Sequence, residues 1–160
     1  MKSVVELGLI AGVAVVAGLG NWLVGGKPSG DPVLELEQIP LKEGEVYLSE
    51  ALEWDKEGVV WVDARPAEKW REETMAGSIN ITMQSDEDLG AQIANHVDAI
   101  LGASRVIVFC DDVHCSVSHD LREQLKGEYR DLVAGEIFVL HGGMTALRAA
   151  GKVTSSSPSP

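Results

Sequence analysis

Three five-residue runs rich in branched apolar side chains constrain the fold of this chain more than any other feature. They are VVWVD at 59–63, RVIVF at 105–109 and EIFVL at 136–140. Apolar runs of this length without alternating polar positions predict strands that helices cover on both faces, as in parallel sheets. Two shorter stretches, at 46–48 and 78–81, are further candidate strands.

Stretches with helical spacing of apolar residues lie between these runs. We expect helices at 49–58, 85–101, 117–129 and 144–150. The third places Leu121 and Leu125 four residues apart on one helical face. Strands that alternate with helices predict an α/β domain with a mostly parallel sheet. Functional groups in such folds lie in the loops that follow the carboxyl ends of the strands.

The N-terminal segment 7–26 has no charged side chain. Its helical length, at about 1.5 Å per residue, matches the hydrocarbon thickness of a bilayer, which predicts a transmembrane helix within an anchor at 1–26. A cleaved signal peptide is the alternative, but the run is long for a signal core and lacks a clear cleavage motif. Lys2 and the amino terminus give a slight positive excess, so we expect a single-pass protein of the cell membrane with its domain on the non-cytoplasmic side.

The remaining sequence divides into three parts. Glycine, proline and serine near residue 30 predict a linker at 27–38, and TSSSPSP predicts a disordered tail at 153–160. Residues 39–152 then suit one compact domain. The net charge of −12 repels nucleic-acid phosphates, so no nucleic-acid partner is expected. The sequence leaves the oligomeric state open.

Both cysteines of the chain lie in the loop after RVIVF. Cys110 follows the strand directly, and a turn then leads into a helix. Backbone N–H groups at such a turn produce a positive field that favours a thiolate, so the position suits a nucleophile. The alternative is that Cys110 is simply the last buried residue of its strand, because free cysteine is among the most buried residue types.

Four short motifs follow one another between residues 59 and 151. They are VVWVDARPAEKW with its D-x-R pair at 59–70, MAGSINI at 75–81, VIVFC at 106–110 and FVLHGGMTALRAAG at 138–151. In this order they resemble the rhodanese-like domain, a family of single-domain sulfurtransferases. The second motif is similar to the family's I-P-G-A-I-N, and the fourth to its L-x-G-G-x-x-A-W-x-x-A-G.

The resemblance implies a doubly wound α/β fold with Cys110 as a sulfur acceptor. Its thiolate would attack a small sulfur donor such as thiosulfate, hold the sulfur as a persulfide and pass it to a thiol acceptor, with no cofactor and no metal. Backbone N–H groups of the active loop would stabilise the anions. That loop comprises Asp111, Asp112, Val113, His114, Ser116, Val117 and Ser118. Asp63 and Arg65 are implied to be a structural ion pair, and Gly142 and Gly143 a tight turn.

The loop departs from the family pattern in length and charge. Ser118 stands where the helix-opening serine is expected, which makes the loop about two residues longer than usual. No lysine or arginine occurs from Cys110 to Asp120. Asp111 and Asp112 instead disfavour a thiolate and a dianionic donor such as thiosulfate.

Three other positions depart from related patterns. Cysteine phosphatases need an arginine six residues after the cysteine, and that position is Ser116 here, so phosphatase or arsenate reductase activity is not expected. Thr74 stands where the family usually has histidine, and Leu147 where it usually has tryptophan. These departures indicate a divergent member.

Cys115 is the unusual residue of the loop. It can act as a resolving thiol, which attacks a persulfide or sulfenic acid on Cys110 and closes a disulfide, or it can be an inert small residue. The spacing C-x3-H-C-x3-H also suggests metal ligation by Cys110, His114, Cys115 and His119, but paired C-x2-C spacing is absent and no metal is expected. His119 is instead expected to be a solvated helix residue.

Three functions therefore remain open. The first is a membrane-tethered sulfurtransferase that carries sulfane sulfur as a persulfide on Cys110. The second is a thiol–disulfide redox or peroxide-sensing protein that uses Cys110 and Cys115. The third is a catalytically silent module that docks a protein partner through an acidic face.

Overall fold

The computed structural model describes residues 31–155. The predicted transmembrane helix at 7–26 and the tail residues 156–160 lie outside the described residues. Within 31–155, no helix combines the length and apolar character that a membrane crossing requires.

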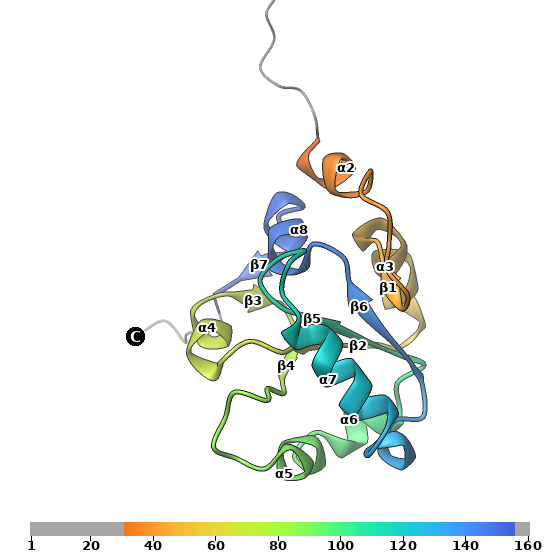
Figure 1. Cartoon of the computed structure of the whole chain (residues 1–160), viewed down its shortest axis with the longest axis vertical. Coiled ribbons are helices and arrows are strands. Elements are labelled where there is room, and N and C mark those ends of the chain that lie inside the picture. The colour runs from red at the N-terminus through yellow and green to blue at the C-terminus, as the bar shows by residue number, and fades with distance from the viewer. Residues whose placement is uncertain (1–30, 156–160) are drawn as a thin grey trace, which may run out of the picture. The chain divides into compact units, whose positions relative to one another are not determined.

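Five parallel strands form the central sheet (Figure 1). Their order is β1 (Glu45–Val46), β6 (Glu136–Leu140), β5 (Arg105–Phe109), β2 (Val59–Asp63) and β4 (Ile79–Asn80). The three longest strands occupy the same residues as the three apolar runs. The predicted mostly parallel α/β sheet is thus confirmed. The strand expected at 46–48 stops at Val46, because Leu48 already begins a helix.

Helices cover both faces of the sheet, and the alternation along β5 explains why. Val106 and Val108 pack into a core with Leu121 and Leu125, whereas Ile107 and Phe109 belong to a second core on the opposite face. The first face carries α5 (Leu89–Ala94), α6 (Val97–Leu101) and α7 (Val117–Lys126), and the second carries α3 (Leu48–Trp54) and α8 (Gly143–Ala149). A strand buried on both faces needs an unbroken apolar run, as the sequence has.

Short elements complete the fold. They are the helices α2 (Pro32–Leu36) and α4 (Ala67–Glu72), the 3-10 turns η1 (Asp55–Glu57) and η2 (Arg130–Leu132), and an antiparallel pair of strands, β3 (Thr74–Met75) and β7 (Val153–Thr154).

The structure differs from the sequence-based boundaries at both ends of the domain. Residues 32–36 were expected in the linker but form α2, because the Asp31 carboxylate accepts a hydrogen bond from the Val33 N–H (3.0 Å) and proline suits the first helical position. Residues 153–154 were expected in the tail but pair with β3 as β7.

The helix expected at 85–101 is also different. It begins at Leu89 rather than at Ser85, because the Asp88 carboxylate caps it by accepting a hydrogen bond from the Ala91 N–H (3.1 Å). The chain then breaks into two short helices, α5 and α6, at 95–96.

Candidate active site

Cys110 lies directly after β5, at the carboxyl edge of the sheet, and only 2% of it is exposed. Its carbonyl oxygen accepts a hydrogen bond from the Met144 N–H at the start of α8 (2.8 Å). Gly142 and Gly143 have positive φ values of 80° and 47°, as a tight turn requires. A Cβ on Gly143 would overlap the Cys110 carbonyl, so this turn presses against the cysteine backbone.

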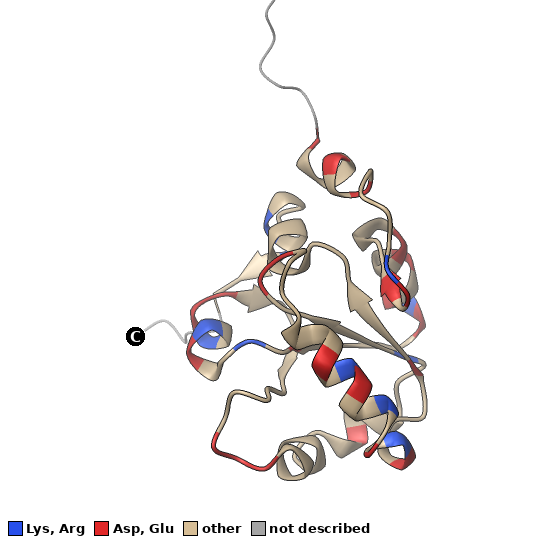
Figure 2. Cartoon of the chain, in the orientation of Figure 1, with Lys and Arg blue, Asp and Glu red and all other residues tan. Residues whose placement is uncertain are grey.

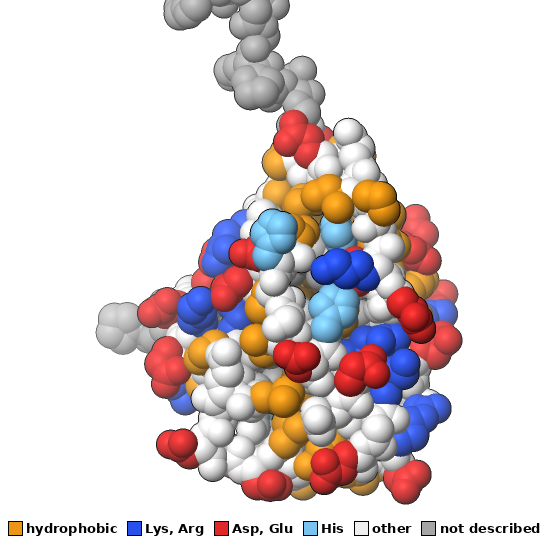
Figure 3. Space-filling view, in the orientation of Figure 1, with side chains coloured by type: hydrophobic (Ala, Val, Ile, Leu, Met, Phe, Trp, Pro, Cys, Tyr) orange, Lys and Arg blue, Asp and Glu red, His pale blue; other side chains and the backbone are white. Residues whose placement is uncertain are grey.

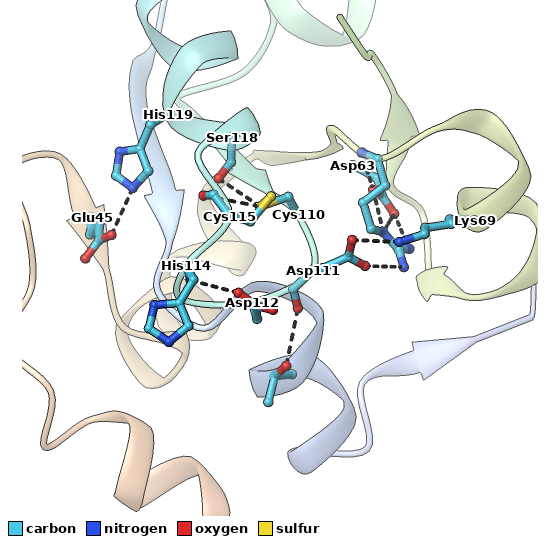
Figure 4. Close-up of a disulfide and its surroundings, with 12 residues drawn as sticks. Glu45, Asp63, Lys69, Cys110, Asp111, Asp112, His114, Cys115, Ser118 and His119 are labelled. Atoms are coloured by element: carbon cyan, nitrogen blue, oxygen red, sulfur yellow. Dashed lines mark hydrogen bonds and ion pairs between the residues drawn. A yellow bond between two sulfur atoms is a disulfide. The ribbon is translucent and has the colours of Figure 1, made fainter. Parts of the chain in front are cut away.

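Cys110 and Cys115 form a disulfide, with their Cα atoms 6.4 Å apart (Figure 4). The Ser118 hydroxyl, which is buried, lies 3.3 Å from the Cys110 sulfur. Cys115 is only half-buried. The two thiols of the chain are therefore close enough to react with each other, and they differ in access to solvent.

A compact turn brings Cys115 back over Cys110. The Asp112 carboxylate accepts a hydrogen bond from the His114 N–H (2.8 Å), and the Asp112 carbonyl accepts one from the Cys115 N–H (3.2 Å). Helix α7 then begins at Val117, as the sequence predicted, and Ser116 precedes it. Ser118 lies in the first turn of α7, and its hydroxyl faces the Cys110 sulfur.

Cations from outside the loop neutralise part of its negative charge. Figure 2 shows acidic residues in the loop with no lysine or arginine among them. However, the Asp111 carboxylate contacts the Lys69 ammonium of α4 (2.8 Å) and lies 3.7 Å from the Arg65 guanidinium. Asp111 therefore opposes a nearby thiolate less than the loop sequence alone predicts, whereas Asp112 and Asp120 remain exposed.

Asp63, the last residue of β2, and Arg65 form a buried ion pair. The Asp63 carboxylate accepts hydrogen bonds from the Arg65 guanidinium (2.6 Å) and from the Thr74 hydroxyl (2.7 Å). The Arg65 side chain is 3% exposed, and its guanidinium also donates to the Glu73 carbonyl. Thr74, at the position where histidine is usual in the family, thus has a definite role as a donor to Asp63.

A second buried carboxylate was missed in the sequence. Glu45 accepts hydrogen bonds from His119 Nε2 (3.0 Å), His141 Nδ1 (2.9 Å) and the Lys42 N–H (2.8 Å). Burial by itself would raise the pKa of Glu45, but the Lys42 N–H and the two imidazoles outweigh burial and hold that pKa below its ordinary value. Figure 3 shows histidine side chains gathered in the upper half of one face.

No sequence signal connects Glu45 with these two histidines, because the three residues lie on β1, on α7 and directly after β6. His119 lies on a helix as expected, but its side chain is only 27% exposed because it contacts Glu45 rather than projecting freely into solvent. His119 follows Ser118, and His141 precedes the Gly142–Gly143 turn. Glu45 therefore links two segments that both contact Cys110.

The four residues of the C-x3-H-C-x3-H spacing are not arranged around a common point. Cys110 and Cys115 are bonded to each other, His119 contacts Glu45, and His114 projects away from the sulfur atoms (Figure 4). In the part of the chain that the structure describes, no group of three or more His, Cys, Asp or Glu residues has a metal-binding arrangement.

Comparison with known proteins identifies the family. The family model for the rhodanese-like domain matches residues 47–150. The chain belongs to the rhodanese-like domain family. The match spans β2, β5, the Cys110 loop and the glycine turn of this rhodanese-like domain. No curated protein sequence matches the chain.

Solved structures are similar to this rhodanese-like domain at low sequence identity. The BH2092 protein from Bacillus halodurans is 18% identical with a TM-score of 0.51, and the match covers 68% of this chain and 72% of that protein. A thiosulfate sulfurtransferase from Pseudomonas aeruginosa is 19% identical with a TM-score of 0.49. That match covers 74% of this chain but only 22% of the Pseudomonas protein.

Proposed function

We propose that this rhodanese-like protein is a sulfurtransferase that carries sulfane sulfur on Cys110, and that Cys115 resolves the persulfide. One observation carries the proposal: the Cys110 sulfur lies at the carboxyl edge of the sheet, within bonding reach of Cys115 and 3.3 Å from the Ser118 hydroxyl. A buried hydroxyl can donate to a thiolate or a persulfide anion, and the start of α7 adds a favourable field.

The chemistry has two steps. In the first, the Cys110 thiolate attacks the outer sulfur of a donor, so that a new sulfur–sulfur bond forms and the remainder of the donor leaves with the electron pair. The persulfide can then pass its outer sulfur to an external thiol. Alternatively, the Cys115 thiolate attacks the Cys110 sulfur, the Cys110–Cys115 disulfide forms, and hydrosulfide leaves. The two protein thiols are thereby oxidised and the sulfane sulfur is reduced.

The charges around the loop favour a weakly charged donor. Lys69 and Arg65 contact Asp111, but Asp112 and Asp120 are exposed and would repel a dianion such as thiosulfate. A protonated hydropolysulfide or an organic persulfide carries at most one negative charge on its sulfur chain, whereas thiosulfate carries two. We therefore expect these donors to react faster than thiosulfate.

The proposal includes a membrane tether. The uncharged run at 7–26 supports a single-pass anchor, and the slight positive excess before it supports a domain on the non-cytoplasmic side. Alkaline carbonate extraction of membranes, followed by protease treatment of sealed cells, tests both parts. Release of the full-length protein by carbonate would contradict the anchor.

Intact mass spectrometry tests the sulfur chemistry. The reduced full-length protein is treated with polysulfide, and wild type is compared with Cys110→Ser and Cys115→Ser. We expect Cys115→Ser to gain one sulfur atom, Cys110→Ser to gain none, and wild type to lose two hydrogen atoms while it releases one hydrosulfide. A sulfur atom gained by Cys110→Ser at the rate seen for Cys115→Ser would refute Cys110 as the acceptor.

The disulfide itself favours a second candidate, a thiol–disulfide redox or peroxide-sensing protein. In that case Cys110 would be oxidised by peroxide to a sulfenic acid, and Cys115 would displace water to close the same disulfide. Peroxide would then oxidise wild type rapidly, whereas polysulfide would leave no sulfur on Cys115→Ser. This pattern would replace the sulfurtransferase proposal.

A further inference from the structure

We infer that the Cys110–Cys115 disulfide is reduced by attack at the Cys115 sulfur, and that the reductant is a dithiol with positive charge around its attacking thiol. The inference rests on the proposed function only for how the disulfide arises. It adds the partner class that returns the site to its dithiol form and the atom at which that partner reacts.

Access distinguishes the two sulfurs. Cys110 is 2% exposed at the end of a central strand, and its backbone is covered by the turn that contains Gly143 and Met144. Cys115 is half-buried and lies between His114 and Ser116, both of which are exposed. An external thiolate must approach a disulfide sulfur along the sulfur–sulfur axis. Cys115 is the more exposed of the two residues, so approach to its sulfur is less hindered than approach to the sulfur of Cys110.

The surroundings of Cys110 suit a leaving group. Attack at Cys115 expels Cys110 as a thiolate, whose sulfur lies 3.3 Å from the Ser118 hydroxyl in the first turn of α7. This hydroxyl can donate a hydrogen bond to the departing anion, and disulfide exchange is faster when the leaving thiolate is stabilised. The buried sulfur is thus released in the form that accepts the next sulfur atom.

The exchange balances with a dithiol alone. The first thiolate of the reductant bonds to Cys115, and the bond to Cys110 breaks with its electron pair on Cys110. The second thiol of the reductant loses its proton and attacks the reductant's own sulfur in the mixed disulfide. Cys115 then leaves as a thiolate and takes up a proton. The reductant has become a disulfide, and both protein cysteines are reduced.

The charge of the loop selects among reductants. Asp112 precedes Cys115 in the turn, Asp120 lies one helical turn after Ser116, and both are exposed. No lysine or arginine occurs in 110–120, and Lys69 is engaged by Asp111. An incoming anionic thiol is therefore repelled, whereas a thiol with a cationic neighbour is attracted.

The site of attack is tested by trapping the mixed disulfide. The oxidised full-length protein receives a short pulse of the monothiol cysteamine, is quenched in acid with N-ethylmaleimide, and is analysed by peptide fragmentation. We expect cysteamine on Cys115 and maleimide on Cys110 in about tenfold excess over the reverse pattern. Cysteamine mainly on Cys110 would overturn the inference, and so would failure of the two cysteines to form a disulfide under mild oxidation.

The charge selection is tested with three monothiols. Rate constants per thiolate are measured for cysteamine, 2-mercaptoethanol and 2-mercaptoethanesulfonate. We expect cysteamine to exceed the sulfonate about fivefold at low salt, with less difference at high salt. The difference should shrink in the double variant Asp112→Asn/Asp120→Asn and persist in Glu136→Gln, which changes an exposed acid at the opposite edge of the sheet. Equal rates for all three thiols in wild type would overturn the selection.

These results are distinguishable from a failure of the proposed function. If Cys115→Ser gains sulfur from polysulfide but the trapped thiol is found on Cys110, sulfur transfer stands and the order of reduction is wrong. If Cys115→Ser gains no sulfur but the thiol is trapped on Cys115, reduction at Cys115 stands and the sulfurtransferase proposal is wrong.

Discussion

Two buried carboxylates flank the Cys110 loop, and their partners differ in kind. The arginine cluster comprises Asp63, Arg65 and Thr74, and the histidine cluster comprises Glu45, His119 and His141. Figure 4 shows Asp63 on one side of the disulfide and Glu45 with His119 on the other. Both clusters connect segments that contact the cysteine loop.

The two clusters differ in geometry and burial. The arginine cluster carries a bidentate contact in nearly complete burial, whereas His119 is 27% exposed. We therefore expect the arginine cluster to contribute more to stability.

Asp63→Asn should give the largest effect, because it removes the charge that the buried Arg65 guanidinium contacts directly and leaves only Asp111, at 3.7 Å, as a charged partner. We expect a loss of about 3–5 kcal/mol in the free energy of unfolding at neutral pH. Urea denaturation of the full-length protein measures it. Glu68→Gln, which alters an exposed pair with Arg71, is the control and should leave the midpoint unchanged. Equal effects of the two substitutions would show that the cluster is not a structural support.

Glu45→Gln should give the second largest effect. A glutamine has only one acceptor atom, so a donor that faces its amide nitrogen loses its acceptor, and we expect a loss of about 1–3 kcal/mol at neutral pH. The same urea experiment provides the comparison with Asp63→Asn. A loss larger than that of Asp63→Asn would reverse the proposed ranking of the two clusters.

The pH dependence of this loss sharpens the comparison further. Since the pKa of Glu45 is lower in the folded than in the unfolded chain, the unfolded chain binds more protons as the pH falls, and the stabilisation declines. It is fully present above the ordinary glutamate pKa of about 4.3 and disappears through the lowered folded-state value. The stability difference between wild type and Glu45→Gln should thus shrink as the pH falls from about 6 to 3. A stability difference that does not change with pH would show that the lowered pKa of Glu45 is not its cause.

The two clusters also show what the sequence could predict. Asp63 ends the apolar strand β2 and Arg65 lies two residues later, so the D-x-R motif predicted their pairing. The position of Cys110 directly after a strand could also be predicted from its neighbours in the sequence. So could β2, β5 and β6, because a strand that is buried on both faces has an unbroken apolar run. Glu45 was missed because its partners His119 and His141 lie on other elements, and because a strand of two residues has no periodicity to detect.

The charge around Cys110 was also predicted incorrectly from the loop sequence. The loop sequence predicted uncompensated acids beside Cys110, whereas the fold brings Lys69 of α4 against Asp111. The pairing of β3 with β7 was missed for the same reason, since its two strands lie far apart in the sequence and each has two residues. In each case, the contact that was not predicted joins residues that lie far apart in the sequence and meet only in the folded chain.

Lys69→Gln tests that contact and should give the smallest effect on stability, below about 1 kcal/mol, because the pair is half exposed. Its effect should instead be on reactivity. In a Cys115→Ser background, loss of the Lys69 ammonium leaves the Asp111 carboxylate beside the Cys110 loop with only the more distant Arg65 as a cation, and we expect alkylation by neutral iodoacetamide to slow about two- to threefold. Lys69→Arg is the matched control and should keep the original rate. Adding Asp111→Asn to Lys69→Gln should restore it, whereas an unchanged rate in Lys69→Gln alone would show that Arg65 and solvent already compensate Asp111.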